Sequence, residues 1–153
     1  MNRKEIDKLG GLHSAKIILY SVEFAEIENY QSSNQWEKCG EILGRAAKKL
    51  EDAGADFILI CSNTIHKVTS QIASMIQIPV VHIADATADE LKTCHIKRVG
   101  LLGTRYTIKG AEGVILGCTE IGLLIHQSDV SVPVFDTTVI HAKKAVQIAL
   151  TDS

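Results

Sequence analysis

The feature that most restricts the fold of this chain is an internal repeat. Residues 54–64 align without a gap to residues 110–120, so that Ser62 aligns with Cys118. Each copy passes from a glycine through an acidic residue into an apolar strand, and an Ile-Pro-Val or Val-Pro-Val segment follows at 78–80 or 132–134. The repeat fits two ordinary strand–helix–strand units, or two lobes that face each other across a pseudo-twofold cleft.

Apolar strands alternate with helical segments along the chain. Most of the strands lack polar alternation, as is typical of strands buried on both faces of a parallel sheet. The alternation therefore predicts an α/β fold in which helices flank parallel sheets, with ligands binding in the loops after Ile60, Leu102 and Leu116. The expected strands are 15–21, 57–60, 79–81, 99–102 and 114–116, and the expected helices are 2–9, 34–53 (capped by Asn34), 64–76 and 84–94.

The connection between the strands at 99–102 and 114–116 is unusually short. Only residues 103–113 separate them, whereas a parallel crossover usually needs a dozen or more residues and a helix. Residues 104–108 resemble the start of a helix that does not continue. We therefore expect a segment to be missing near residues 108–109, which would leave the second lobe incomplete.

Composition excludes several classes of function. The chain has 153 residues, enough for one domain or two small lobes, and its net charge of −2 argues against nucleic-acid binding. No apolar run reaches the length of a membrane span, and residues 1–8 lack a signal-peptide core, so we expect a cytoplasmic protein. The four cysteines show no C-x-x-C spacing and the six histidines no zinc-ligand spacing, so we expect free thiols and no metal site. We expect Cys39, Cys61 and Cys94 to be structural.

Seven short motifs occur in order over nearly the whole chain. Three of them are Cys-Ser-Asn-Thr-Ile-His-Lys at 61–67, Gly-Cys-Thr-Glu at 117–120 and Pro-Val-Phe-Asp-Thr at 133–137; the others are at 10–15, 21–28, 82–87 and 99–107. Together they resemble the aspartate/glutamate racemase family, in particular its aspartate-racemase branch. The resemblance implies two pseudo-symmetric α/β lobes, the first formed by residues 1–97 and 128–153 and the second, incomplete, by residues 98–127.

The chain departs from the family pattern in three places. The opening strand and its Gly-Gly loop have no counterpart, and about half of the second lobe is absent. The family's first catalytic cysteine stands directly before Asn-Thr, where this chain has Ser62, and Cys61 precedes it by one residue. Because adjacent side chains in a strand point to opposite faces, we do not expect Cys61 and Ser62 to face the same cleft.

The resemblance implies a racemase that uses no pyridoxal phosphate, metal or nucleotide. Two side chains flank the substrate's α-carbon: one removes the α-proton, and the other returns a proton to the opposite face. A thiol suits the base because its ordinary pKa of about 8.5 is readily lowered at a helix N-terminus, and Cys118 is expected between a strand and a helix. A serine hydroxyl is a much weaker acid and a poorer base. We therefore expect Cys118 to be the competent base and Ser62 the weaker partner, and the resemblance implies that Cys118 acts on the L-enantiomer.

Several further residues are candidates for binding the amino-acid substrate, aspartate or glutamate. Side chains and amides at the starts of the expected helices suit its carboxylate, although capping alone also explains Asn-Thr. Glu120 is expected to bind substrate or to hydrogen-bond a neighbouring site residue. The full set of expected substrate-binding residues is Asn63, Thr64, Thr119, Gln31, Lys67 and Glu120.

Two other functions compete with amino-acid racemisation. The same scaffold carries hydantoin racemases, maleate isomerases and arylmalonate decarboxylases, although the Thr-Glu after Cys118 and the His-Lys after Asn63-Thr64 favour the amino-acid branch. Alternatively, the chain is an inactive truncated fragment that binds a ligand or self-associates. The family commonly forms dimers, so the resemblance also implies a homodimer, without nucleic-acid or membrane partners.

Overall fold

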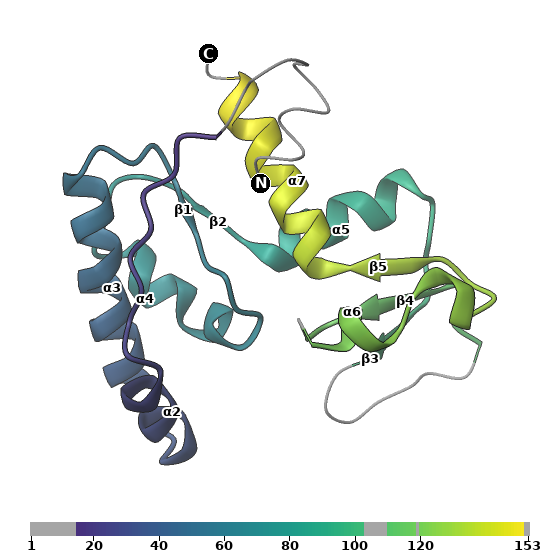
Figure 1. The fold of residues 1–153 in the computed structure, drawn as a ribbon, viewed down its shortest axis with the longest axis horizontal. Coiled ribbons are helices and arrows are strands. Elements are labelled where there is room, and N and C mark those ends of the chain that lie inside the picture. The colour runs from purple at the N-terminus through teal and green to yellow at the C-terminus, as the bar shows by residue number, and fades with distance from the viewer. Residues whose placement is uncertain (1–14, 103–109, 119, 152–153) are drawn as a thin grey trace. The chain divides into compact units, whose positions relative to one another are not determined.

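The computed structural model describes residues 15–102, 110–118 and 120–151 (Figure 1). They form two compact units. The N-terminal unit comprises residues 16–60 and 64–81. The C-terminal unit comprises, among the described residues, Ala15 and the ranges 61–63, 82–102, 110–118 and 120–151. The lobe boundaries expected from the resemblance, near residues 97 and 128, stay a prediction.

The N-terminal unit packs helices around one short parallel strand pair. Strand β1 (Ile58–Leu59) pairs with β2 (Val80–Val81), with Ile58 opposite Val80. The core contains Ile27, Cys39, Ile65 and Ile72, each less than a tenth exposed. The helical elements are α2 (Phe24–Ser32), α3 (Trp36–Asp52), the 3-10 helix η1 (Thr64–Val68) and α4 (Thr69–Ala73).

Helices α3 and α4 approach closely because α3 carries glycine at the contact. A Cβ atom on Gly40 would lie 1.9 Å from the Gln71 Oε1 atom, and one on Gly44 would lie 2.2 Å from the Met75 Sδ atom. Cys39 is fully buried beside this contact, and its thiol donates a hydrogen bond of 3.7 Å to the Ile27 carbonyl. Burial raises the pKa of the Cys39 thiol, as befits a structural cysteine.

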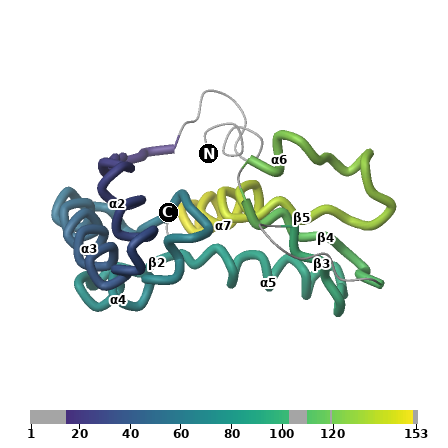
Figure 2. Tube along the Cα trace, turned by 90° about the horizontal axis from the view of Figure 1, so that it is seen from below, coloured from purple at the N-terminus to yellow at the C-terminus, as the bar shows by residue number. Residues whose placement is uncertain are grey.

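The C-terminal unit is built on a three-stranded parallel sheet. Its strands are β3 (Val99–Leu102), β4 (Gly113–Leu116) and β5 (Val134–Asp136), in the order β3-β4-β5. Phe135 lies opposite Ile115 in the register and packs with Ala86 and Ile140 from the two long helices. Those helices, α5 (Ile83–Thr93) and α7 (Thr137–Thr151), lie side by side in Figure 2. The short elements α6 (Ile121–Leu124) and η2 (Gln127–Asp129) lie between β4 and β5 in the chain.

The described residues of the two repeat copies share a glycine conformation and one strand hydrogen bond. Gly54 and Gly110 adopt φ angles of +88° and +86°, a region that favours glycine. A strand follows each glycine. In each strand, one backbone amide donates a hydrogen bond to the proline carbonyl of the Ile-Pro-Val or Val-Pro-Val segment. The Ile58 amide donates to the Pro79 carbonyl at 2.8 Å, and the Val114 amide donates to the Pro133 carbonyl at 2.9 Å. The repeat therefore corresponds to a repeated parallel strand pair.

The predicted parallel α/β class is confirmed, and so is the parallel pairing across the short connection. Val99 lies opposite Gly113 and Leu102 opposite Leu116, so β3 and β4 run in the same direction. Residues 103–112 connect them, fewer than the usual parallel crossover. The suspected helix start at 104–108 lies outside the described residues, as do residues 1–14 with the predicted helix 2–9.

Four local predictions are wrong. Residues 15–21 form no strand, since they have no strand partner in the described part of the chain, and Ile17 to Tyr20 are exposed. Asn34 does not cap α3; its φ is +57° and its side chain accepts from the Trp36 indole instead. The predicted helix 64–76 divides into η1 and α4, where the Thr69 hydroxyl donates to the His66 carbonyl. Cys61 is exposed rather than packed in the sheet.

Among the described residues, no helix is both long and apolar enough to cross a lipid bilayer.

Candidate active site

The loop after β1 carries the first predicted catalytic position. Ser62 and Asn63 are half-buried whereas Cys61 is exposed, and all three residues lie beyond the end of β1 at Leu59. The Asn63 Nδ2 atom donates a hydrogen bond of 3.2 Å to the Thr137 Oγ1 atom. This bond holds the Ser62–Asn63 loop against the first residue of α7.

Thr137 also connects to the strand that leads to Cys118. Its side chain is only 5% exposed, and its hydroxyl donates a hydrogen bond of 2.8 Å to the Leu116 carbonyl at the end of β4. Leu116 stands two residues before Cys118, and Asn63 directly follows Ser62. The two loops that carry the predicted catalytic side chains are thus joined through one threonine hydroxyl.

Cys118 is half-buried and makes a short contact with an acidic neighbour. Its thiol donates a hydrogen bond of 2.6 Å to the Glu120 Oε2 atom. Glu120 is exposed and precedes α6, which has only four residues. A helix this short has a small macrodipole, and the expected anion-binding terminus after Cys118 includes Thr119, outside the described residues, so it stays a prediction. The Glu120 carboxylate is the polar group beside the thiol.

Asp136 fixes the corner between β5 and α7. Its Oδ1 atom accepts hydrogen bonds from the Thr138 and Val139 amides at 2.8 and 3.2 Å, which caps α7. Its carboxylate also lies against α6, where a Cβ atom on Gly122 would be 2.8 Å from the Oδ2 atom. The segment after Cys118 therefore packs on the same corner that holds Thr137.

The sequence does not by itself indicate Asp136 and Thr137 as site residues, although both fall in one of the seven motifs. The feature of the sequence that points to Asp136 is the internal repeat. Asp136 follows the Val-Pro-Val segment as His82 follows Ile-Pro-Val, and both side chains cap a helix. Ligands bind at the carboxyl ends of parallel strands. A helix-capping residue that follows such a strand in both repeat copies therefore indicates a turn that positions site residues.

Other predicted substrate-binding residues belong to the N-terminal unit. Thr64 is exposed at the start of η1, and Gln31 is half-buried in α2. The Lys67 ammonium lies 3.9 Å from the centre of the Trp36 ring, a cation–π contact within that unit. Thr119 lies outside the described residues. The structure therefore links Asn63 to Thr137 and Cys118 to Glu120, and the substrate contacts of the predicted residues stay predictions.

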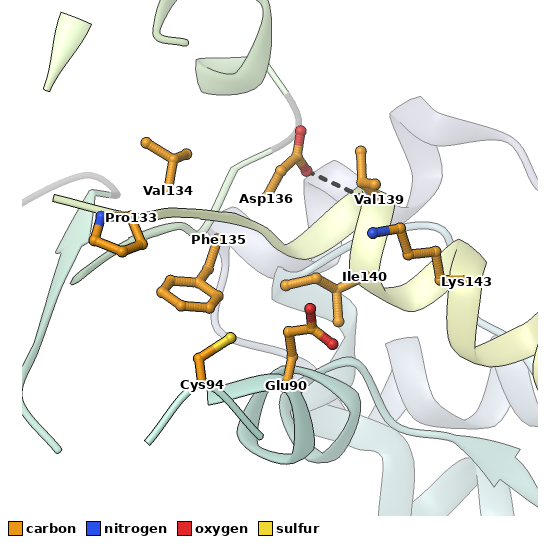
Figure 3. Close-up of a pocket in the computed structure, with 9 residues that line it drawn as sticks. All are labelled: Glu90, Cys94, Pro133, Val134, Phe135, Asp136, Val139, Ile140 and Lys143. Atoms are coloured by element: carbon orange, nitrogen blue, oxygen red, sulfur yellow. Dashed lines mark hydrogen bonds between the residues drawn. The ribbon is translucent and has the colours of Figure 1, made fainter. Parts of the chain in front are cut away.

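A separate cavity of about 290 Å³ lies between α5, β5 and α7 (Figure 3). Phe135 and Ile140 form its apolar part, and Glu90, Cys94 and Lys143 add polar groups. The Asp136 carboxylate points away from the Phe135 ring and toward the Val139 amide in this view (Figure 3). None of the predicted catalytic or substrate-binding residues lines the cavity.

An ion pair supports the start of the sheet. The Glu112 carboxylate accepts from the Lys97 amide at 3.1 Å and pairs with the Arg98 guanidinium at 2.8 Å. The hydrogen bond from the Lys97 amide, with further help from Arg98, lowers the pKa of Glu112. This interaction joins the segments that lead into β3 and β4, the strands flanking the undescribed connection.

Comparison with known proteins gives consistent matches. The sequence model of the Asp/Glu/hydantoin racemases matches residues 3–110, a range that contains Ser62 but ends before Cys118. The broad-specificity amino-acid racemase RacX of Bacillus subtilis (strain 168) is 37% identical over 65 residues. That alignment covers 42% of this chain and only 28% of RacX, so this chain matches about a quarter of the length of that relative.

Solved structures resemble the chain over nearly its whole length. A candidate Asp/Glu racemase from Yersinia pestis is 38% identical with a TM-score of 0.90, covering 97% of this chain and 90% of that one. An aspartate racemase homologue from Pyrococcus horikoshii OT3 is 28% identical with a TM-score of 0.82, covering 97% and 92%. An aspartate racemase from Picrophilus torridus, at 20% identity, TM-score 0.68 and coverage of 97% and 88%, supports the fold alone.

Proposed function

The chain belongs to the Asp/Glu/hydantoin racemase family, and from that premise we propose that it is an amino-acid racemase that acts without a cofactor. Its proposed substrates are L- and D-aspartate or glutamate. The observation that carries the proposal is the junction at Thr137. It joins the loop of Ser62 to the strand that leads to Cys118 through hydrogen bonds of 3.2 and 2.8 Å. A two-base racemase needs two such loops held in a fixed relation.

The proposed reaction begins with the thiol of Cys118. The thiol passes its proton to Glu120, whose carboxylate oxygen lies 2.6 Å away, and becomes a thiolate. The thiolate removes the α-proton of the L-substrate and leaves a carbanion. The Ser62 hydroxyl then donates its proton to the opposite face of the α-carbon, which gives the D-product. Water reprotonates Ser62, and the hydroxide so formed takes the proton held by Glu120, which restores the carboxylate while Cys118 keeps the former α-proton as a thiol. Asn63, Thr64 and Thr119 hold the substrate carboxylate in this scheme.

The two faces of the site are proposed to be unequal because a serine is a poorer base than a thiolate. The equilibrium constant of a racemisation is one, so kcat/KM must be the same in both directions. The inequality therefore appears in proton exchange without inversion. The L-substrate exchanges its α-proton with solvent through Cys118 faster than the D-substrate does through Ser62.

The range of substrates and the assembly are also proposals. RacX carries a broad-specificity name, so the assay for this chain includes neutral and basic amino acids beside aspartate and glutamate. The family resemblance further supports a homodimer. Light scattering after size-exclusion chromatography measures that state directly, and a mass equal to one chain would contradict it.

Chiral chromatography tests the proposed activity. Purified protein is incubated with each L-amino acid and the D-product is measured over time, with the Cys118→Ala variant and a matched Cys94→Ala control. Cys94 is an exposed cysteine at the end of α5 in the same unit. We expect D-aspartate or D-glutamate from the wild type and Cys94→Ala but not from Cys118→Ala. Equal product from all three proteins, or from none with any amino acid, would contradict the proposal.

A second candidate is a ligand-binding protein that does not racemise. It is favoured by the short connection of residues 103–112, which has fewer residues than a parallel crossover usually needs. Titration calorimetry with L-aspartate separates the two candidates. Heat of binding without D-product would favour the second candidate over the first.

A further inference from the structure

We propose that Thr137 is a positioning residue. Its hydroxyl sets the orientation of the Asn63 amide and fixes the Ser62–Asn63 loop to the strand that leads to Cys118. The side chain touches neither of the proposed bases directly, so any effect on the reaction passes through Asn63 and Leu116. The relevance to catalysis rests on the proposed function, whereas the orientation of the amide can be measured without it.

The orientation follows from counting hydrogen-bond donors. The Leu116 carbonyl can only accept, so at 2.8 Å the single proton of the Thr137 hydroxyl points to it. The hydroxyl oxygen can then only accept from Asn63, at 3.2 Å. The Nδ2 side of the Asn63 amide must therefore face Thr137, and its Oδ1 atom must point away. This leaves the second Nδ2 proton of Asn63 to donate to a substrate carboxylate and its Oδ1 atom to accept from a donor such as the substrate ammonium group.

Burial of the Thr137 side chain favours this single orientation of the two hydrogen bonds. Thr137 is 5% exposed, so water competes little for either hydrogen bond. The backbone at this point is also fixed, because the Asp136 carboxylate accepts from the Thr138 and Val139 amides that follow. Loss of the hydroxyl would leave the Leu116 carbonyl without this donor and would free the Asn63 amide to rotate.

The chain offers a matched control for a purely structural role. Thr87 in α5 is 4% exposed, and its hydroxyl also donates to a carbonyl, that of Ile83, at 2.8 Å. Thr87→Val removes the same chemical group from the same unit, at a position that does not contact Asn63 in the described structure. Thr137→Val removes the proposed link while keeping a β-branched side chain, and Thr137→Ser keeps the hydroxyl.

The first measurement follows the Asn63 side-chain amide in a 1H–15N correlation spectrum of the full chain, with the signal assigned by its loss in Asn63→Asp. We expect this signal to move toward the position of solvent-exposed amides in Thr137→Val and to stay in place in Thr137→Ser and Thr87→Val. An unmoved signal in folded Thr137→Val would overturn the proposal. If Thr137→Val does not fold, Thr137→Ala replaces it. Solvent exchange of the same amide protons is also measured in the wild type at one fixed pH, and exchange as fast as that of a free asparagine side chain would overturn the proposal.

The second measurement is steady-state kinetics with L-aspartate. A variant that merely lowers the folded fraction lowers kcat and leaves KM unchanged, whereas a misplaced binding amide raises KM. We expect Thr137→Val to lower kcat/KM by about 10- to 100-fold with a raised KM. Thr137→Ser and Thr87→Val should stay near the wild type. Adding Thr137→Val to Asn63→Ala should change little further, because both substitutions remove the same interaction.

The two measurements separate the two proposals. A moved amide signal with an inactive wild type would support the positioning role and overturn the racemase function. An active wild type in which Thr137→Val behaves like Thr87→Val would leave the racemase function standing and overturn the role of Thr137 in it. A moved signal together with the raised KM would support both.

Discussion

The thiol of Cys118 donates a 2.6 Å hydrogen bond to the carboxylate of Glu120, two residues further along the chain. Both residues stand in the loop between β4 and α6, in the second copy of the internal repeat. A carboxylate at this distance can receive the proton that a thiol must lose before it acts as a base. In the proposed mechanism, this pair supplies the base of the second loop.

Replacing Glu120 with glutamine tests the proton-accepting role. The Glu120→Gln side chain can still accept a hydrogen bond from the thiol but cannot hold its proton. We therefore expect kcat for L-aspartate to fall about 100-fold, within the range of general-base contributions, with little change in KM. Glu90→Gln in α5 is the control for loss of a carboxylate from the same unit. A Glu120→Gln enzyme as active as Glu90→Gln would remove Glu120 from the mechanism.

Replacing Ser62 with cysteine tests the inequality of the two bases. In D2O, the wild type should exchange the α-proton of L-aspartate faster than that of D-aspartate, and Ser62→Cys should raise exchange of the D-enantiomer. NMR loss of the α-proton signal measures both rates. Cys61→Ala is the control, because the adjacent exposed thiol should contribute nothing. Equal exchange of both enantiomers by the wild type would be incompatible with an asymmetric site.

Acid stability should depend on Glu51 in the N-terminal unit. Its carboxylate pairs with the Lys48 ammonium and accepts from the Gln77 and Ile78 amides at 2.6 and 3.0 Å. The hydrogen bond from Lys48, followed by that from the Gln77 amide, lowers the pKa of Glu51 from its ordinary value of 4.5. A lowered pKa stabilises the fold above the ordinary value, and this contribution is lost as pH falls through the lowered pKa.

Urea unfolding at two pH values checks this expectation. Glu51→Gln should be less stable than the wild type near neutral pH, and the difference should shrink well below pH 4.5. Glu41→Gln, which removes an exposed partner of Arg45 on the same helix, should change stability little at either pH. A Glu51→Gln deficit that is the same at both pH values would show that the carboxylate's charge is not its source.

The parts of the fold that the sequence predicts well are those fixed by local patterns. The predicted strand 99–102 matches β3, because its apolar run Val-Gly-Leu-Leu ends at another glycine, Gly103. The repeat also predicts the two equivalent strand pairs. Gly54 and Gly110 open the two copies, and both have the positive φ angle that favours glycine. The strand predicted at 15–21 is wrong because a strand needs a partner strand, and a single sequence does not show whether a partner lies beside an apolar segment.

Residues of the candidate site are likewise predicted from the sequence only where a local pattern indicates them. Ser62 and Cys118 are visible from the repeat, because they follow equivalent strands. Thr137 is not, because its importance depends on hydrogen bonds to Asn63 and Leu116 across 74 and 21 residues of sequence. Lys67 has the chemistry to bind a carboxylate, but the structure places its ammonium over the Trp36 ring. Long-range contacts of this kind leave no periodic signal in the sequence.

The role of Cys118 as the base is tested by following the α-proton of L-aspartate in D2O with wild-type and Cys118→Ala protein, using NMR together with chiral chromatography. We expect the wild type to incorporate deuterium at the α-carbon and to form D-aspartate, and Cys118→Ala to do neither. Deuterium incorporation and D-aspartate formation at the wild-type rate in Cys118→Ala would contradict the assignment of Cys118 as the base.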